Sequence, residues 1–293
     1  MYEAFYGLRQ KPFSILPDPR FLYASRTHRV ALNLLEYGVA EQNGFIVLTG
    51  EVGTGKTTLI RHLLNLVEDE VVVGLVPPTY PSLDDLMKSV LLAFDLEFRG
   101  MDHVEQHKAL VDSLIKRYAE GKRSVLIIDE AQHLGAHALE HLRIFSNINT
   151  GTDHLLQFVL VGQPELRTML QRPDLRQFVQ RVSVDYNLEP LTRPDTSAYI
   201  RHRLEVAGGS AHLFDQSACA AAHYLSRGIP RLINALCDLA LVHGFADEQT
   251  QIDIDVVIDA AIARSQGGIL VFEPLSENLS RDQIKARVLE VVG

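Results

Sequence analysis

Short apolar runs alternate along residues 45–190 with longer segments in which apolar side chains recur every three or four positions. Short runs of this kind are typical of buried strands, and the longer period is typical of helices that pack one face against a sheet. The expected strands cover residues 45–49, 71–76, 124–128, 155–161 and 182–186, and the expected helices cover 59–64, 86–94, 103–119 and 136–148. This alternation predicts a doubly wound α/β fold with a parallel sheet, which binds ligands beyond the carboxyl ends of its strands.

The pattern changes near residue 190, after which no strand period is found. Helices are expected at residues 196–206, 217–225, 229–245 and 255–265. The sequence therefore predicts an α/β domain with an N-terminal arm over residues 1–190, a small all-helical lid domain over 191–265, and a tail over 266–293. Within the tail, residues 269–272 have the composition of a strand, and Ile284, Val288, Leu289 and Val292 have the spacing of one helix face.

The first expected strand runs directly into a glycine-rich loop and then a helix. The loop residues are Gly50, Glu51, Val52, Gly53, Thr54, Gly55, Lys56, Thr57 and Thr58, which match the phosphate-binding loop in its strand, loop and helix context. Glycines let backbone N–H groups turn inward around a phosphate, and the following helix adds the positive end of its dipole. We expect Lys56 to reach the β- and γ-phosphates and Thr57 to bind Mg²⁺, which predicts a nucleoside triphosphatase that uses ATP and Mg²⁺.

Two carboxylates follow the expected strand at 124–128. Asp129 is placed to approach Mg²⁺, and Glu130 is suited to orient and deprotonate the attacking water, which is the task of a general base in ATP hydrolysis. The alternative is a buried strand that ends in a solvated acidic turn. The phosphate loop upstream favours the catalytic interpretation.

Composition and charge indicate what kind of protein carries this chemistry and where it is located. A chain of 293 residues that is 46% hydrophobic can bury a large core, and its net charge of −9 argues against coating of nucleic acid by bulk charge, although a local basic patch stays open. No apolar stretch approaches the roughly 20 residues that span a bilayer, and the N-terminus lacks the layout of a signal peptide, so a cytoplasmic location is expected. Cys219 and Cys237 lie in apolar, helix-like segments and are expected to be reduced core residues.

We expect a strand to be inserted between the phosphate-loop strand and the strand before Asp129. This arrangement, with Glu130 as a catalytic carboxylate, resembles the AAA+ family of P-loop ATPases. That resemblance implies further roles. Gln163, at the end of the next strand, is similar in position to sensor 1, which holds the attacking water or senses the γ-phosphate. Arg181 directly precedes the last strand and is the first candidate for the arginine finger supplied to a neighbouring subunit. The alternate is Arg176, and Arg231, in the first turn of a helix, is similar in position to sensor 2.

Longer motifs refine the resemblance. They lie at residues 5–8, 12–14, 17–23, 48–58, 129–132, 161–166 and 228–234, and so cover nearly all of residues 1–265. Together they resemble the ExeA/GspA group of AAA+ ATPases, which includes ATPases of type II secretion and pilus assembly. The group is similar to the TniB/TnsC-type ATPases that regulate transposition. Secretion members usually continue into a transmembrane helix and a peptidoglycan-binding part, which residues 1–293 do not include.

The resemblance implies an ATPase that assembles as a homo-oligomeric ring or filament, because an arginine finger acts on the ATP of another subunit. Its expected output is the driving or switching of an envelope or secretion-type machine. The alternative is an ATP-dependent DNA-binding regulator of transposition or a related DNA transaction, with DNA as a partner. The protein client is open in both cases.

Aromatic residues of the N-terminal arm have two interpretations. Phe13, Phe21 and Tyr23 have the character of an adenine pocket. The alternative is that they only pack the arm onto the folded chain.

Overall fold

The computed structural model describes residues 1–16, 18–41, 44–67, 71–76, 83–266, 272 and 280–292. The chain divides into two compact units. The sheet unit consists of Arg26–Glu51 and Lys56–Leu188. The helical unit consists of Met1–Ser25, Val52–Gly55 and Glu189–Gly293.

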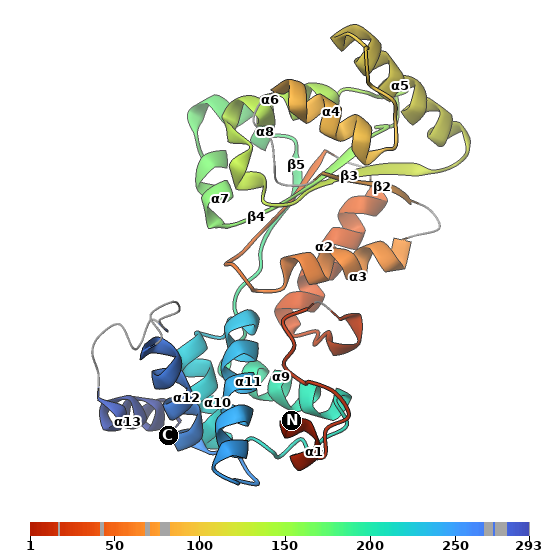
Figure 1. Cartoon of the computed structure of the whole chain (residues 1–293). Helices are drawn as coiled ribbons and strands as arrows, with labels where there is room; N and C mark the ends of the chain where they lie inside the picture. The colour runs from red at the N-terminus through yellow and green to blue at the C-terminus, as the bar shows by residue number, and fades with distance from the viewer. Residues whose placement is uncertain are drawn as a thin grey trace. The chain divides into compact units, whose positions relative to one another are not determined.

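The sheet unit is built on five parallel strands (Figure 1). They are β1 (Phe45–Thr49), β2 (Val71–Val76), β3 (Arg123–Ile128), β4 (Gln157–Gly162) and β5 (Val182–Asn187). Their order across the sheet is β2-β3-β4-β1-β5, so β4 lies between the strand before the glycine-rich loop and the strand before Asp129. The prediction of a parallel α/β sheet is confirmed, with each strand within one or two residues of its expected bounds.

Helices cover both faces of the sheet because successive strand residues point to opposite sides. Phe45 and Val47 face a core formed with α4 (Leu83–Ala93), α5 (His103–Ala119), α6 (Gly135–Phe145), α7 (Pro164–Leu170) and α8 (Arg176–Val179). Ile46 and Leu48 face the opposite core, formed with α2 (Arg26–Glu41) and α3 (Lys56–Val67) (Figure 1). All five residues of β1 are buried, as expected for the central strand of a two-sided sheet.

Within the described residues, five helices of the C-terminal part of the helical unit pack around one core. They are α9 (Arg193–Val206), α10 (Gln216–Ser226), α11 (Pro230–Ala246), α12 (Ile254–Gln266) and α13 (Arg281–Val292). Thr192 and Asp215 cap α9 and α10 by accepting hydrogen bonds from backbone N–H groups three residues on, which fixes where these helices begin. The predicted helical region is confirmed. Ile284 and Val288 of α13 are fully buried, whereas Leu289 is exposed, and the strand expected at residues 269–272 lies largely outside the described residues.

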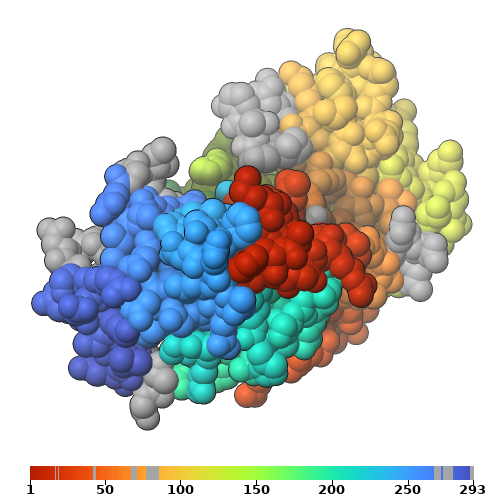
Figure 2. Space-filling model, turned by 60° about the horizontal axis from the view of Figure 1, so that its bottom comes forward, coloured from red at the N-terminus to blue at the C-terminus, as the bar shows by residue number. Residues whose placement is uncertain are grey.

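The N-terminal arm packs within the helical unit, whereas the sequence pattern groups it with residues 26–190 (Figure 2). Its helix α1 (Tyr2–Phe5) contacts α11, and its 3-10 turn η1 (Pro19–Phe21) contacts α9. The guanidinium of Arg203 donates to the carbonyl oxygens of Pro12 and Ser14 and lies 4.7 Å from the centre of the Phe21 ring. These contacts satisfy a buried charge and hold the arm in place.

The arm's aromatic side chains belong to that core. Phe13 is 1% exposed, with its ring centre 5.7 Å from that of Phe214, and Phe21 is also buried. The ring centre of Tyr23 lies 6.1 Å from that of Tyr199. Phe13 and Phe21 therefore pack in the core of the helical unit, as the packing interpretation expects.

Two glycines that precede strands provide a matched stability test. Gly44 before β1 and Gly121 before β3 both have positive φ angles, 65° and 75°. A Cβ on Gly44 would lie 2.1 Å from the Arg181 carbonyl oxygen, whereas a Cβ on Gly121 meets nothing within 4 Å. Gly121→Ala should cost about 1 kcal/mol through backbone strain alone. Gly44→Ala should cost about 3 kcal/mol or more, because the clash with the backbone adds to the strain. Urea denaturation of both variants measures the difference, and equal midpoints would contradict this packing.

Candidate functional site

Three strand ends bring the predicted polar residues together. The carboxyl ends of β1, β3 and β4 are adjacent because β4 pairs with both of the other strands. Parallel strands end at one edge of a sheet, so the residues that follow them meet there. The hydroxyl of Thr57, at the start of α3, donates to Oδ2 of Asp129 at 3.2 Å. The structure thus joins the loop after β1 to the acidic turn after β3.

The glycine-rich loop has the backbone that its sequence requires. Gly53 and Gly55 have φ angles of 87° and 103°, a region that favours glycine. The ammonium of Lys56 donates to the carbonyl oxygens of Gly50 and Glu51 at 2.7 Å and 3.0 Å. Burial lowers the pKa of Lys56, and the nearby carboxylates of Glu130, Asp129 and Glu51 partly oppose that shift. The lysine is therefore held inside the loop next to acidic groups.

The remaining loop residues differ in exposure. Thr54 is buried and Thr58 is half-buried, while Glu51, Val52 and Thr57 are exposed. The tip of the loop, Val52–Gly55, clusters with the helical unit, and the rest of the loop clusters with the sheet unit.

Glu130 sits in a sharp turn directly after β3. Its φ and ψ are 52° and 39°, the left-handed conformation, and its N–H donates to Oδ1 of Asp129 at 2.9 Å. In a residue other than glycine this conformation costs about 1–2 kcal/mol of strain, and such strain occurs at functional sites where the surroundings hold it in place. The turn separates two adjacent carboxylates, so Asp129 faces Thr57 while Glu130 faces the end of β4.

Two amides bind the same oxygen of Glu130. Nε2 of Gln163 donates to its Oε2 at 2.9 Å, and Nε2 of Gln132 donates to it at 2.5 Å. The hydrogen bond from Gln163 contributes most to lowering the pKa of Glu130. The hydrogen bond from Gln132 and the positive charge of Lys56 lower it further, whereas burial opposes the shift. Glu130 is consequently a carboxylate at neutral pH, which is the form that a general base requires.

Gln132 is the one residue of this cluster for which the sequence predicts no role. It lies in the 3-10 turn η2 (Ala131–His133), two positions after Glu130. Its place inside the motif 129–132 is the available signal. A polar residue after an acidic pair has no diagnostic spacing of its own, so only the folded turn reveals the contact.

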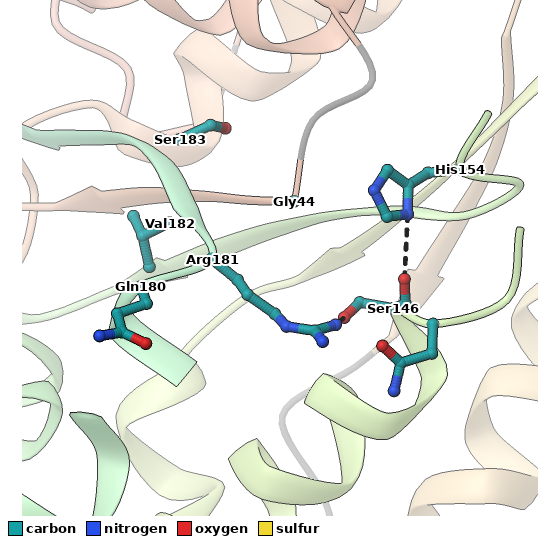
Figure 3. A pocket seen from close by; sticks show the side chains of 8 residues that line it. Gly44, Ser146, His154, Gln180, Arg181, Val182 and Ser183 are labelled. Carbon is teal, nitrogen blue, oxygen red and sulfur yellow. Dashed lines mark hydrogen bonds between the residues drawn. The ribbon is translucent and has the colours of Figure 1, made fainter. Parts of the chain in front are cut away.

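Arg181 lies at a different edge of the sheet from this cluster. It precedes β5, whose first residue pairs with Phe45 at the amino end of β1. Its Nη1 donates to the Ser146 hydroxyl at 2.7 Å, beyond the end of α6 (Figure 3). The side chain borders a cavity of about 390 Å³ that is also lined by Ser146, Asn147 and His154. The structure therefore does not bring Arg181 to the Glu130 of its own chain.

The other two predicted arginines are exposed. Arg176 is the first residue of α8. Arg231 lies in the first turn of α11, and its backbone N–H donates to the carbonyl oxygen of Gly53 at 3.2 Å, within the helical unit. A Cβ on Gly53 would lie 2.5 Å from the Cβ of Arg231, so glycine is needed for this close approach.

The site offers hard oxygen donors for a divalent ion. In the parts of the chain that the structure describes, no group of three or more His, Cys, Asp or Glu residues is arranged to hold a metal. Thr57 and Asp129 supply one hydroxyl and one carboxylate. Mg²⁺ is commonly bound by one or two such protein groups together with phosphate oxygens and waters, so the pair fits Mg²⁺ bound with a nucleotide.

The fold and the sequence matches define the class of protein. Residues 39–170 match the family model described as an AAA domain, and they contain the phosphate loop, Asp129, Glu130 and Gln163. The chain therefore carries an AAA domain with the P-loop fold, which implies nucleotide binding. The AAA+ fold predicted from the sequence is confirmed.

Among curated proteins, General secretion pathway protein A of Aeromonas hydrophila is 46% identical over 249 residues, which are 84% of this chain and 45% of that protein. The resemblance to the ExeA/GspA group is thereby confirmed, and the chain spans less than half the length of this relative. The ATP-dependent target DNA activator B of Escherichia phage Mu is 25% identical over 225 residues, which are 67% of this chain and 69% of that protein.

Solved structures share the fold at low identity. Cdc6p from Pyrobaculum aerophilum has a TM-score of 0.65 and 17% identity, over 86% of this chain and 70% of that one. The ORC2 protein of Aeropyrum pernix, in ADPNP and ADP complexes, has a TM-score of 0.63 and 18% identity, over 86% of this chain and 71% of that one. At these identities the likeness concerns the fold alone. Within the described residues, no helix is long and apolar enough to cross a membrane.

Proposed function

We propose that this chain is an ATPase that binds and hydrolyses ATP with Mg²⁺. The observation that carries the proposal is the arrangement at the strand ends, where Thr57 and Asp129 share a hydrogen bond and the adjacent Glu130 accepts hydrogen bonds from two amides. These are a metal-binding pair and a general base on neighbouring elements, and the phosphate loop supplies the third requirement. The experiment that tests the proposal is release of inorganic phosphate from ATP.

Each residue has a defined task. The loop N–H groups and Lys56 bind the phosphates, and Thr57 and Asp129 would hold Mg²⁺, which neutralises charge on the phosphate oxygens. Glu130 accepts a proton from the attacking water. Gln163 adjoins Glu130 and orients that water or contacts the γ-phosphate. Arg231 is the proposed sensor 2 residue, which contacts the γ-phosphate of the same chain.

A further positive charge, which stabilises the transferring phosphoryl group, is supplied by an arginine of another subunit of a homo-oligomer. Arg181 lies at the amino end of β5, so it serves a neighbour's ATP rather than that of its own chain. In the isolated chain its guanidinium is held by Ser146, and assembly must release it. Arg176 is the alternate finger, because its side chain is exposed on α8.

The proposed biological role is the driving or switching of an envelope or secretion-type machine. The support is the 46% identity to General secretion pathway protein A. The second candidate is an ATP-dependent DNA-binding regulator, and the similarity to the target DNA activator B of phage Mu favours it.

Binding to duplex DNA separates these roles. Filter binding would be measured with and without a non-hydrolysable ATP analogue, at two salt concentrations. A DNA regulator should show binding that requires the analogue and weakens steeply with salt. Absence of such binding supports the envelope role, and its presence supports the DNA role.

Lys56→Ala should weaken ATP binding by about 10- to 100-fold, because a hydrogen bond to a charged group contributes about 1.5–3 kcal/mol. The matched control is Lys122→Ala, which removes an exposed lysine that precedes β3 in the same unit. Nucleotide affinity would be measured by titration with a fluorescent ATP analogue. Unchanged affinity of Lys56→Ala would remove this lysine from the phosphate site.

A further inference from the structure

The side chain of Gln132 bridges two strand ends. Its Nε2 donates to Oε2 of Glu130 after β3, and its Oε1 accepts the backbone N–H of Gln163 after β4 at 3.0 Å. The first bond reaches a rotatable carboxylate, and the second reaches the backbone between β4 and α7. One amide therefore ties the proposed base to the rigid framework of the domain.

The bridge depends on a glycine at the end of β4. A Cβ on Gly162 would lie 2.9 Å from Oε1 of Gln132 and 2.8 Å from Cδ2 of Leu166. Any larger residue at this position would compete with the amide for the same space. Gly162 has no positive φ angle to explain it, so the close approach of side chains is the physical reason for glycine here.

The two amides on Glu130 are not equivalent. Gln163 reaches the carboxylate only through its own side chain, which can rotate toward a ligand. Gln132 is anchored at both ends, by Glu130 on one side and by the Gln163 backbone on the other. Loss of the Gln163 hydrogen bond would leave the bond from Gln132 to Glu130 in place.

We propose that Gln132 is a positioning residue that aims the carboxylate of Glu130 for catalysis. This inference rests on the proposed ATPase function. Gln132 does not touch the reacting atoms and acts through Glu130. Displacement of a catalytic group by about 1 Å can cost about 100-fold in rate, so loss of the bridge should lower kcat while ATP binding stays intact.

Gln132→Met tests the proposal, because methionine has a similar length and volume but neither donates nor accepts strongly. We expect kcat to fall by about 10- to 100-fold. The affinity for a fluorescent ATP analogue should stay within about twofold of wild type, because no phosphate contact is removed. The control is Gln171→Met, the same change at an exposed glutamine at the far end of α7, and it should leave both quantities unchanged.

A double-mutant cycle separates positioning from general damage. If Gln132 acts through Glu130, adding Gln132→Met to Glu130→Gln should leave the residual kcat unchanged. Three results would overturn the proposal: a wild-type kcat for Gln132→Met, a parallel loss of nucleotide affinity, or an equal further loss of kcat in the Glu130→Gln background. Absence of turnover in the wild-type chain would instead overturn the proposed ATPase function, so the two failures are distinguishable.

Discussion

Glu130→Gln should bind ATP and Mg²⁺ normally but lose turnover by about 10²- to 10⁴-fold, the range that general-base catalysis contributes. The amide has the shape of the carboxylate, and its oxygen can still accept from both neighbouring amides, but it cannot accept the proton of the attacking water. Steady-state phosphate release and nucleotide affinity would be measured on the same preparations. The effect should therefore appear in kcat and not in binding.

The matched control for this variant is Glu165→Gln. Glu165 is an exposed carboxylate in the first turn of α7, close enough to Lys56 to act on its charge, and it contacts neither Gln132 nor Gln163 through a side-chain hydrogen bond. Its turnover should stay within about twofold of wild type, because a charge screened by solvent contributes little. Normal turnover of Glu130→Gln would remove Glu130 from the mechanism.

Arg181→Ala should bind ATP normally and hydrolyse it about 10³- to 10⁵-fold more slowly, which is the contribution of an arginine finger. The reason is that a guanidinium from the next subunit stabilises charge on the transferring phosphoryl group. Arg172→Ala is the control, because Arg172 is exposed and pairs with Asp174 two residues away. Turnover and the assembly state would be measured for both variants.

The defect of Arg181→Ala should be rescued by mixing. In an assembly that contains equal amounts of Arg181→Ala and Glu130→Gln chains, about a quarter of the interfaces pair an intact Glu130 with an intact Arg181 of the neighbour. Each variant alone has none. Recovery toward a quarter of wild-type activity supports action in trans, and lack of recovery despite co-assembly would contradict it. The same mixing with Arg176→Ala identifies which of the two arginines is the finger.

The fold could be predicted from the sequence because its signals are local. Each strand is a short apolar run, and its buried positions alternate between two cores, as with Phe45 on one face and Ile46 on the other. The helices of the helical unit follow from apolar spacing, whereas the cap at Thr192, which begins α9 at Arg193 rather than at residue 196, was found only in the structure. The position of a residue that directly follows a strand can also be predicted. Asp129 and Gln163 follow adjacent parallel strands, so both must lie at the carboxyl edge of the sheet.

Contacts between distant residues could not be predicted in this way. Phe13 packs against Phe214, and the preceding residue, Pro12, accepts a hydrogen bond from Arg203, so both contacts join segments about 200 residues apart in the sequence. The role of Gln132 depends on the left-handed turn at Glu130 and on the missing side chain of Gly162. None of these dependences leaves a periodic or composition signal, so the structure was needed to find them.

Phosphate release from ATP at increasing concentrations of the wild-type chain, with Mg²⁺ and beside Glu130→Gln, tests the central claim most directly. The proposed site and its assembly predict Mg²⁺-dependent release whose rate per chain rises with protein concentration, because each active site is completed by a neighbour. Glu130→Gln should bind ATP and release almost no phosphate under the same conditions. Release by the wild-type chain that never exceeds that of Glu130→Gln, with ATP bound to both, would contradict the account.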